Sequence, residues 1–223
     1  MNHLIFYFDF ISPYAYLAFK QLPEALKGIS YRVDYRPILF ASLLKHHGQL
    51  GPAEIAPKRA WTYRHAMWLA NQLGVPLRMP ASHPFNSLPL LRLALAARVG
   101  ASLDGQVGNC NRYVCEQIFS YAWTSGVNLA DVADAGNFGA LVEQLHGQAW
   151  QSDAVKSSLR ANTDAAINQD IFGVPTVEVD GKLFWGQDAL PMLRDYLLGG
   201  PWFDGSGWQS ANLIPVGASR LKL

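Results

Sequence analysis

The chain has 223 residues, of which 50% are hydrophobic and 16% are charged. This composition supports a substantial core, argues against disorder, and fits one large domain or one domain that carries an insert. The 18 Lys and Arg residues nearly balance the 17 Asp and Glu residues, so no global field attracts the chain to nucleic acid or to an anionic membrane. We therefore expect a small-molecule partner.

The amino-terminal apolar run is predicted to be a core strand and not a targeting or membrane segment. Asp9 interrupts it early, and neither a basic stretch nor a small-residue cleavage site accompanies it. Later apolar stretches such as residues 88–99 contain Arg92 and Arg98, and they fall short of the roughly 20 residues that cross a bilayer. We expect a soluble, cytoplasmic protein.

The first 36 residues are predicted to form a βαβ unit. Residues 4–8 are continuously apolar, as in a central strand that is covered on both faces. Ser12 then fits the N-cap of a helix that is disturbed near Pro23 and ends by Gly28. Residues 29–36 alternate between apolar and polar, so a second strand, parallel to the first, follows.

The middle of the chain, from about residue 40 to residue 154, has helical patterns and no convincing strand. Helices are predicted over three stretches, each stopped by a glycine: residues 57–73 before Gly74, residues 88–99 before Gly100, and residues 111–124 before Gly126. A fourth helix, over residues 152–169, is expected to run to a left-handed cap at Gly173.

The last part of the fold is predicted to be a hairpin and a helix. Residues 176–179 and 182–185 flank Asp180-Gly181, and Asp188 then fits the N-cap of a helix that closes at Gly199. The predicted division is a discontinuous α/β domain over 1–38 and 155–200, a helical insertion domain over 39–154, and a C-terminal tail over 201–223 that folds irregularly over the surface.

Metal and disulfide chemistry are not expected. Cys110 and Cys115 are five positions apart in a helical pattern, which matches neither a redox pair nor a zinc pair, so we interpret them as buried structural thiols. His46 and His47 diverge on a helix and have no further ligand at metal-binding spacing.

Three segments in this order, residues 9–14, 172–176 and 184–188, resemble the kappa-class glutathione transferases, and most of all their bacterial relatives, the 2-hydroxychromene-2-carboxylate isomerases. The resemblance runs over about residues 3–200. It implies an α/β, thioredoxin-like fold, β-α-β … α-β-β-α with a large all-helical insertion, with glutathione as cofactor. It also implies a place in aromatic hydrocarbon catabolism such as naphthalene degradation.

Ser12 is the predicted catalytic residue. A Ser-Pro pair at a helix start needs no role beyond capping, but the positive end of a helix also stabilises a thiolate. The resemblance implies that glutathione supplies the sulfur and that Ser12 hydrogen-bonds it. It also implies a cis bond before Pro175, which would leave the backbone of Val174 free to pair with an extended tripeptide.

The remaining ligand contacts are expected partly from the resemblance, which covers residues 185–188 and the region of Lys45 to Leu50, and partly from residue type. The γ-glutamyl end of glutathione is expected at Trp185, Gly186, Gln187 and Asp188. The aromatic substrate is expected at Tyr14, Lys45, Gln49, Leu50 and Phe85, with Phe40, Trp61 and Trp185 as further candidate walls and Lys58, Arg59 and Arg64 as alternative cations.

The predicted function is glutathione-dependent cis–trans isomerisation of 2-hydroxychromene-2-carboxylate or a related aromatic pyruvate, by transient thiolate addition. A kappa-class-like transferase that conjugates small electrophiles uses the same thiolate and stays open as an alternative. A noncatalytic thioredoxin-like module is a weaker alternative, and a thiol-disulfide oxidoreductase would lack its reactive cysteine pair. Homodimers, as the family forms, are left open.

Overall fold

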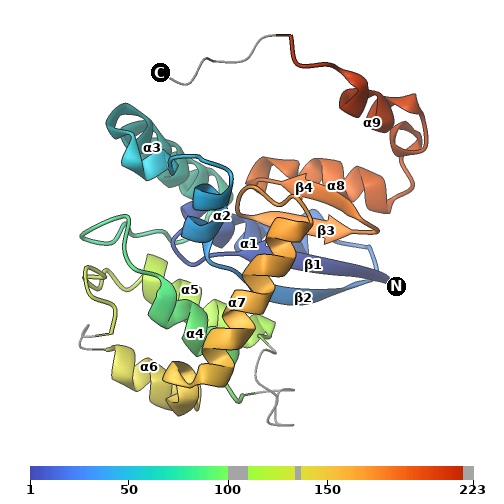
Figure 1. Cartoon of the computed structure of the whole chain (residues 1–223). Coiled ribbons are helices and arrows are strands. Elements are labelled where there is room, and N and C mark those ends of the chain that lie inside the picture. The colour runs from blue at the N-terminus through green and yellow to red at the C-terminus, as the bar shows by residue number, and fades with distance from the viewer. Residues whose placement is uncertain (100–109, 134–136, 218–223) are drawn as a thin grey trace.

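A four-stranded sheet in the order β2-β1-β3-β4 forms the centre of the molecule (Figure 1). The computed structural model describes residues 1–99, 110–133 and 137–217. Strand β2 runs parallel to β1, whereas β3 is antiparallel to β1 and β4 is antiparallel to β3. The strands are β1 (Asn2–Phe8), β2 (Tyr31–Pro37), β3 (Thr176–Val179) and β4 (Lys182–Trp185). The predicted strands and hairpin are thereby confirmed.

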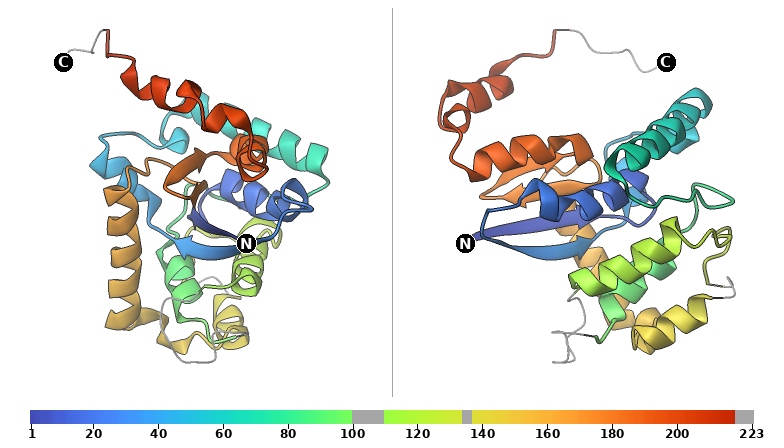
Figure 2. Two further views of the ribbon diagram at one scale, coloured as in Figure 1. Left: turned by 90° about the vertical axis from the view of Figure 1, so that its right-hand side faces the viewer. Right: turned by 180° about the vertical axis from the view of Figure 1, so that it is seen from behind.

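Both faces of β1 are buried, which explains its continuous apolar sequence. Phe6 and Phe8 point into the larger core, together with helix α1 (Pro13–Ala25). Tyr7 points to the opposite face, in a smaller cluster that includes Ala166 of helix α7 (Asp153–Asn168). Helix α1 continues through Pro23 and ends at Ala25. The two further views show α1 and α7 on opposite sides of the sheet (Figure 2).

The helical insertion packs onto the larger core and does not form a core of its own. The ring centroid of Phe119, in the insertion, lies 5.4 Å from that of Phe8 in β1 and 4.7 Å from that of Phe10. The insertion therefore packs directly against β1 and the loop that follows it. The described helices of the insertion are α2 (Phe40–His46), α3 (Ala56–Leu73), α4 (Leu88–Ala96), α5 (Arg112–Trp123) and α6 (Phe138–Gln144), with single 3-10 turns at Pro52–Glu54 and Gln148–Gln151.

The three predicted insertion helices correspond to α3, α4 and α5, which the structure places within a few residues of the expected limits. Gly100, the expected stop of α4, lies outside the described residues. The short helices α2 and α6 were not predicted, because seven residues give too little periodicity to recognise.

Two predicted helix caps are wrong. Helix α7 ends at Asn168 and the positive φ, 58°, is taken by Asp170, so Gly173 is not a left-handed cap. Helix α8 (Leu190–Leu197) begins with Ala189 as its N-cap residue, whereas Asp188 lies one residue earlier, in a 3-10 turn. In both places an additional turn separates the helix from the residue whose type favours a cap.

The C-terminal tail is more ordered than predicted. Short helical turns cover Pro201–Phe203, α9 (Ser206–Ser210) and Ala211–Leu213. Phe203 and Trp208 both stack against Phe184 of the hairpin, at centroid distances of 6.1 and 5.8 Å. We keep the predicted domain limits as a proposal, although α7 begins two residues before the limit at 155.

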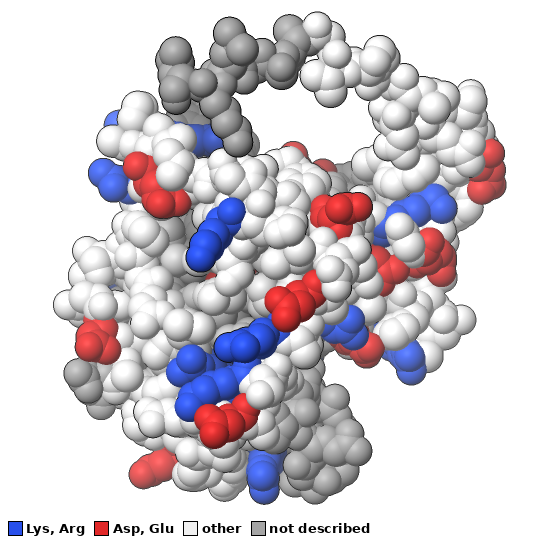
Figure 3. Space-filling view, in the orientation of Figure 1, with Lys and Arg blue, Asp and Glu red and all other residues white. Residues whose placement is uncertain are grey.

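The surface carries both signs of charge. On the face shown in Figure 3, basic and acidic side chains are both present, with a small group of basic ones below the centre, and no large area of one sign covers the face. Across the described residues, no helix has the length and apolar character needed to span a membrane.

Candidate active site

A cavity of about 840 Å³ opens beside the carboxyl end of β1, where that strand leads into α1. The thioredoxin-like part contributes the wall with Ser12, Val174 and Trp185, and the insertion contributes the wall with Lys58 and Phe85. Neither cysteine of the chain lines it. Any sulfur chemistry in this cavity therefore requires a thiol that the protein does not supply.

Ser12 is the N-cap residue of α1, as predicted. Its Oγ accepts a hydrogen bond from the Ala15 amide at 3.2 Å, which leaves the hydroxyl hydrogen available to a ligand. The side chain is buried apart from its edge on the cavity. No acidic residue occupies the first turn of α1, so the positive helix end is not neutralised there. These features suit an anionic sulfur.

Asp9 anchors the loop that leads to Ser12. Its carboxylate accepts hydrogen bonds from the Ile11 amide at 3.1 Å and from the Phe40 amide at 3.0 Å. Because Phe40 begins α2, one buried carboxylate joins the loop to the insertion. Burial raises the pKa of Asp9 to about 6 despite these hydrogen bonds.

The Val174-Pro175 peptide bond is cis, as the resemblance implied. Within the described residues, neither the amide nor the carbonyl group of Val174 has a hydrogen-bond partner, and this residue lines the cavity. The Pro175 carbonyl accepts from the Gly186 amide at 2.9 Å. Val174 therefore offers an unpaired backbone edge to an extended peptide.

Gly173 has a different role from the predicted cap. A Cβ atom at this position would overlap the indole of Trp185, so only glycine permits the ring to lie against the backbone. The Trp185 ring is held edge-on to Phe172 at a centroid distance of 4.8 Å, and both rings line the cavity. Glycine thus shapes this wall of the cavity through close packing.

The segment after Trp185 lies next to the cavity without lining it. Gly186 has a φ of 101°, Gln187 bonds to Gln21, and Asp188 is exposed. Burial, and then the charge of Asp188, raise the pKa of Tyr14, which places this carboxylate near the cavity. A charged ligand end that reached beyond Trp185 would meet these residues.

Four of the five predicted substrate contacts line the cavity. Phe85 is buried, Tyr14 is half-buried with its hydroxyl 2.8 Å from His65 Nδ1, and Gln49 and Leu50 form an exposed part of the rim. Phe40 and Trp185 also line the cavity, as suggested. Trp61 does not; it is exposed and stacks on His65.

Lys45, the cation that the sequence analysis preferred for a substrate carboxylate, lies outside the cavity. It is exposed on α2 and does not line the cavity, because the inward face of this short helix is taken by Leu43, which is buried, and by Leu44, which lines the cavity. Lys58 of α3 does line it and, in the described parts of the chain, forms no ion pair. The geometry thus favours the alternative cation.

The two cysteines are free and buried, as predicted. Cys110 and Cys115 occupy the positions one residue before the N-cap of α5 and four residues into it, a spacing at which apolar side chains pack together. Their sulfur atoms lie 3.2 Å apart, and burial is the largest cause that raises the pKa of Cys115.

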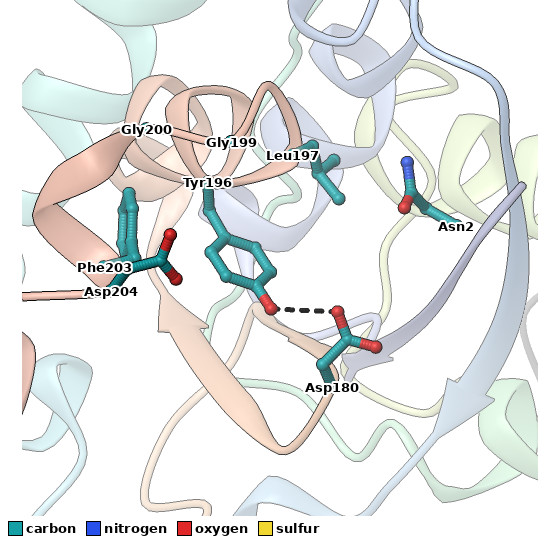
Figure 4. A pocket seen from close by; sticks show the side chains of 8 residues that line it. All are labelled: Asn2, Asp180, Tyr196, Leu197, Gly199, Gly200, Phe203 and Asp204. Atoms are coloured by element: carbon teal, nitrogen blue, oxygen red, sulfur yellow. Dashed lines mark hydrogen bonds between the residues drawn. The ribbon is translucent and has the colours of Figure 1, made fainter.

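A second, smaller hollow of about 250 Å³ lies at the amino end of β1, near Asn2. Figure 4 shows a hydrogen bond between two of its lining residues, in which the Tyr196 hydroxyl donates to Asp180 at 2.9 Å. Ser12 follows the other end of β1, so this hollow is separate from the candidate active site.

Sequence reasoning missed two residues that contribute to the site. Asp9 had a visible signal, a carboxylate directly after a wholly apolar strand, which indicates a buried charge with partners. His83, which lines the cavity, lies in a connection without periodicity and had no signal.

Comparison with known proteins shows which family the chain belongs to. The model of the family described as DSBA-like thioredoxin domain matches residues 3–198. A 2-hydroxychromene-2-carboxylate isomerase from Pseudomonas putida is 30% identical over 201 residues, which cover 85% of this chain and 91% of the relative. A glutathione S-transferase kappa 2 from Caenorhabditis elegans is 26% identical, with 86% and 90% covered.

Solved structures support the same fold. The structure of a 2-hydroxychromene-2-carboxylate isomerase superposes with a TM-score of 0.73 at 24% identity, covering 96% of this chain and all, 100%, of that one. The insertion is therefore part of the shared architecture.

Proposed function

The chain belongs to the DsbA-like thioredoxin domain family, together with the 2-hydroxychromene-2-carboxylate isomerases, and is an enzyme of this isomerase-like kind; on this premise we propose a glutathione-dependent cis–trans isomerase. The proposed substrate is 2-hydroxychromene-2-carboxylate or a related aromatic pyruvate. The observation that carries the proposal is the Ser12 hydroxyl, free to donate, at a helix start in a cavity without cysteine.

The residues of the thioredoxin-like wall fit glutathione. The unpaired amide and carbonyl of Val174 match the backbone of an extended tripeptide, and this pairing places the cysteinyl residue in the cavity with Ser12. Beyond Trp185, the Asp188 carboxylate can accept from the γ-glutamyl amine. We propose Ser12, Val174, Pro175 and residues 185–188 as the glutathione site.

The insertion wall fits an aromatic acid. Phe85 offers a flat surface, and Lys58 supplies a positive charge for a carboxylate. Tyr14 of α1 adds a second ring from the thioredoxin-like wall of the same cavity. In place of Lys45, we therefore propose Lys58 as the residue that binds the substrate's carboxylate.

Rotation about a carbon–carbon double bond requires that the bond become single for a time. Glutathione held by Ser12 and Val174 would supply a thiolate for reversible addition to the electron-poor alkene, and it would leave the reaction unchanged. Ser12 and the positive end of α1 stabilise the negative charge on sulfur, so the thiolate is populated near neutral pH. The two walls hold the reactants together, which raises their effective concentration.

A direct test is an absorbance assay of 2-hydroxychromene-2-carboxylate with and without glutathione. The proposal predicts isomerisation that depends on glutathione while the amount of glutathione stays constant. Stoichiometric loss of glutathione would instead identify the transferase alternative, which uses the same wall with Ser12. A lack of glutathione binding in calorimetry would leave the noncatalytic module. Homodimer formation stays a prediction, and sedimentation velocity tests it.

A further inference from the structure

The two peptide planes before Ser12 are hydrogen-bonded at both ends. In the plane between Phe10 and Ile11, the carbonyl accepts from Trp123 Nε1 at 2.9 Å and the amide donates to Asp9 Oδ1 at 3.1 Å. Rotation of this plane would break both bonds, so its direction is fixed from two sides.

The plane between Ile11 and Ser12 is held in the same way. Its carbonyl lies 2.7 Å from His83 Nε2, and its amide donates to the Asp9 carbonyl at 3.1 Å. Because a carbonyl only accepts, Nε2 of His83 carries the ring proton. Nδ1 lies 2.7 Å from the Tyr63 hydroxyl, which also donates to the His83 carbonyl at 2.9 Å. Burial, the largest cause, lowers the pKa of His83, which favours this neutral ring.

Both ring donors come from the insertion. Trp123 ends α5, and His83 lies in the connection between α3 and α4. The direction of the plane between Ile11 and Ser12 determines where the Ser12 side chain leaves the backbone. The insertion therefore fixes the backbone that leads into Ser12, whose Oγ also accepts from the Ala15 amide.

We propose that His83 is a positioning residue for Ser12: its Nε2–H fixes the Ile11 carbonyl and thereby orients the hydroxyl toward the sulfur of glutathione. The inference rests on the proposed function, because it concerns the thiolate of bound glutathione. His83 is not the acid or base of the reaction, since both of its nitrogens are occupied by protein groups. A preorganised donor stabilises charge better than one that must rotate into place.

The test compares His83→Gln with His83→Asn. Both variants carry the same amide, but only the glutamine N–H is as many bonds from Cα as Nε2 of histidine, so only it reaches the Ile11 carbonyl. The readout is the pKa of the thiol of bound glutathione, from thiolate ultraviolet absorbance against pH. We expect His83→Gln to match the wild type and His83→Asn to raise this pKa by about one unit, a tenfold loss of thiolate at fixed pH.

A structural role alone gives a different result. Thermal unfolding would then change in one or both variants while the thiol pKa stayed at the wild-type value, and this outcome overturns the proposal. Tyr63→Phe is the matched control, because it removes the partner of Nδ1 and leaves the bond from Nε2 in place; we expect an unchanged pKa. If His83→Asn fails to fold, Trp123→Phe takes its place, because it removes the hydrogen bond to the neighbouring Phe10 carbonyl. We expect it to raise the thiol pKa of bound glutathione, and an unchanged pKa counts against the proposal.

The wild-type measurement separates this inference from the proposed function. If the wild type does not lower the pKa of bound glutathione, the proposed function fails whatever the variants do. If it does, and the Gln and Asn variants are equal, only the role of His83 fails.

Discussion

The two walls of the cavity work by different means. The thioredoxin-like wall presents backbone groups and a helix cap, as at Val174 and Ser12, whereas the insertion wall presents side chains, as at Lys58 and Phe85. Backbone groups recognise what all peptides share, and side chains distinguish one small molecule from another. The first wall therefore suits a constant cofactor and the second a substrate that can differ between relatives.

The strongest test of this division is Ser12→Ala. Loss of the hydroxyl that we propose to face the sulfur should lower kcat/KM by about 10²- to 10³-fold, comparable to the loss of a preorganised donor elsewhere. Steady-state kinetics with saturating glutathione measures it.

The variant also removes the N-cap of α1, which costs about 1 kcal/mol of stability. Ser152→Ala is the matched control, because Ser152 caps α7 through the Val155 amide at 3.4 Å and does not line the cavity. We expect it to lose stability and keep its rate. Equal losses of rate in both variants would contradict a catalytic role for Ser12.

Asp9 joins the two walls, and its charge state should affect stability. Burial raises its pKa from 3.8 to about 6 in the folded state. Folded Asp9 therefore holds a proton that the unfolded chain has released, so its contribution to stability is lost as pH rises from about 4 to about 6. Relative to Asp9→Asn, the wild type should lose roughly 3 kcal/mol over this range. Urea unfolding of both proteins at several pH values measures the difference, and parallel profiles would exclude it.

Gly173→Ala tests the packing of the thioredoxin-like wall, where we propose that glutathione binds. The new methyl group must displace the Trp185 indole, so we expect the dissociation constant of glutathione to rise about tenfold, the equivalent of ~1.4 kcal/mol. Gly139→Ala in α6 has open space at the Cβ position and serves as control. Calorimetry that shows equal affinities for the two variants would remove Trp185 from the glutathione site.

Lys58→Gln tests the insertion wall, and its expected effect, a change in KM, is the smallest of the four. An exposed charge contributes about 1 kcal/mol, so KM for a carboxylate substrate should rise about fivefold with little change in kcat. Lys45→Gln, a lysine outside the cavity, should leave KM unchanged. A rise in KM with Lys45→Gln alone would restore the original prediction from the sequence.

Local patterns made the strands, the hairpin and the Ser12 cap predictable. Alternation over residues 29–36 and the turn at Asp180-Gly181 depend on neighbours in the chain, and the structure confirms both. The cis bond before Pro175 was known only through the family resemblance.

Features that depend on distant contacts were not predictable. Lys45 and Lys58 differ in which helix face meets the cavity, and the packing of α2 and α3 decides this. The sequence predicts a helix cap at Gly173, but glycine is needed there because the Trp185 indole of β4 packs against the backbone. His83 acts on Ile11, 72 residues away in the sequence. No short-range pattern records such pairs.

The central claim is that the protein stabilises the thiolate of bound glutathione and not one of its own cysteines. A pH titration of the thiolate absorbance of glutathione, bound to the wild type and to Ser12→Ala, tests it most directly. We predict a thiol pKa at least about one unit below that of an ordinary cysteine, about 8.5, in the wild type, and a return toward that value in the variant. An ordinary pKa for glutathione bound to the wild type would contradict the account.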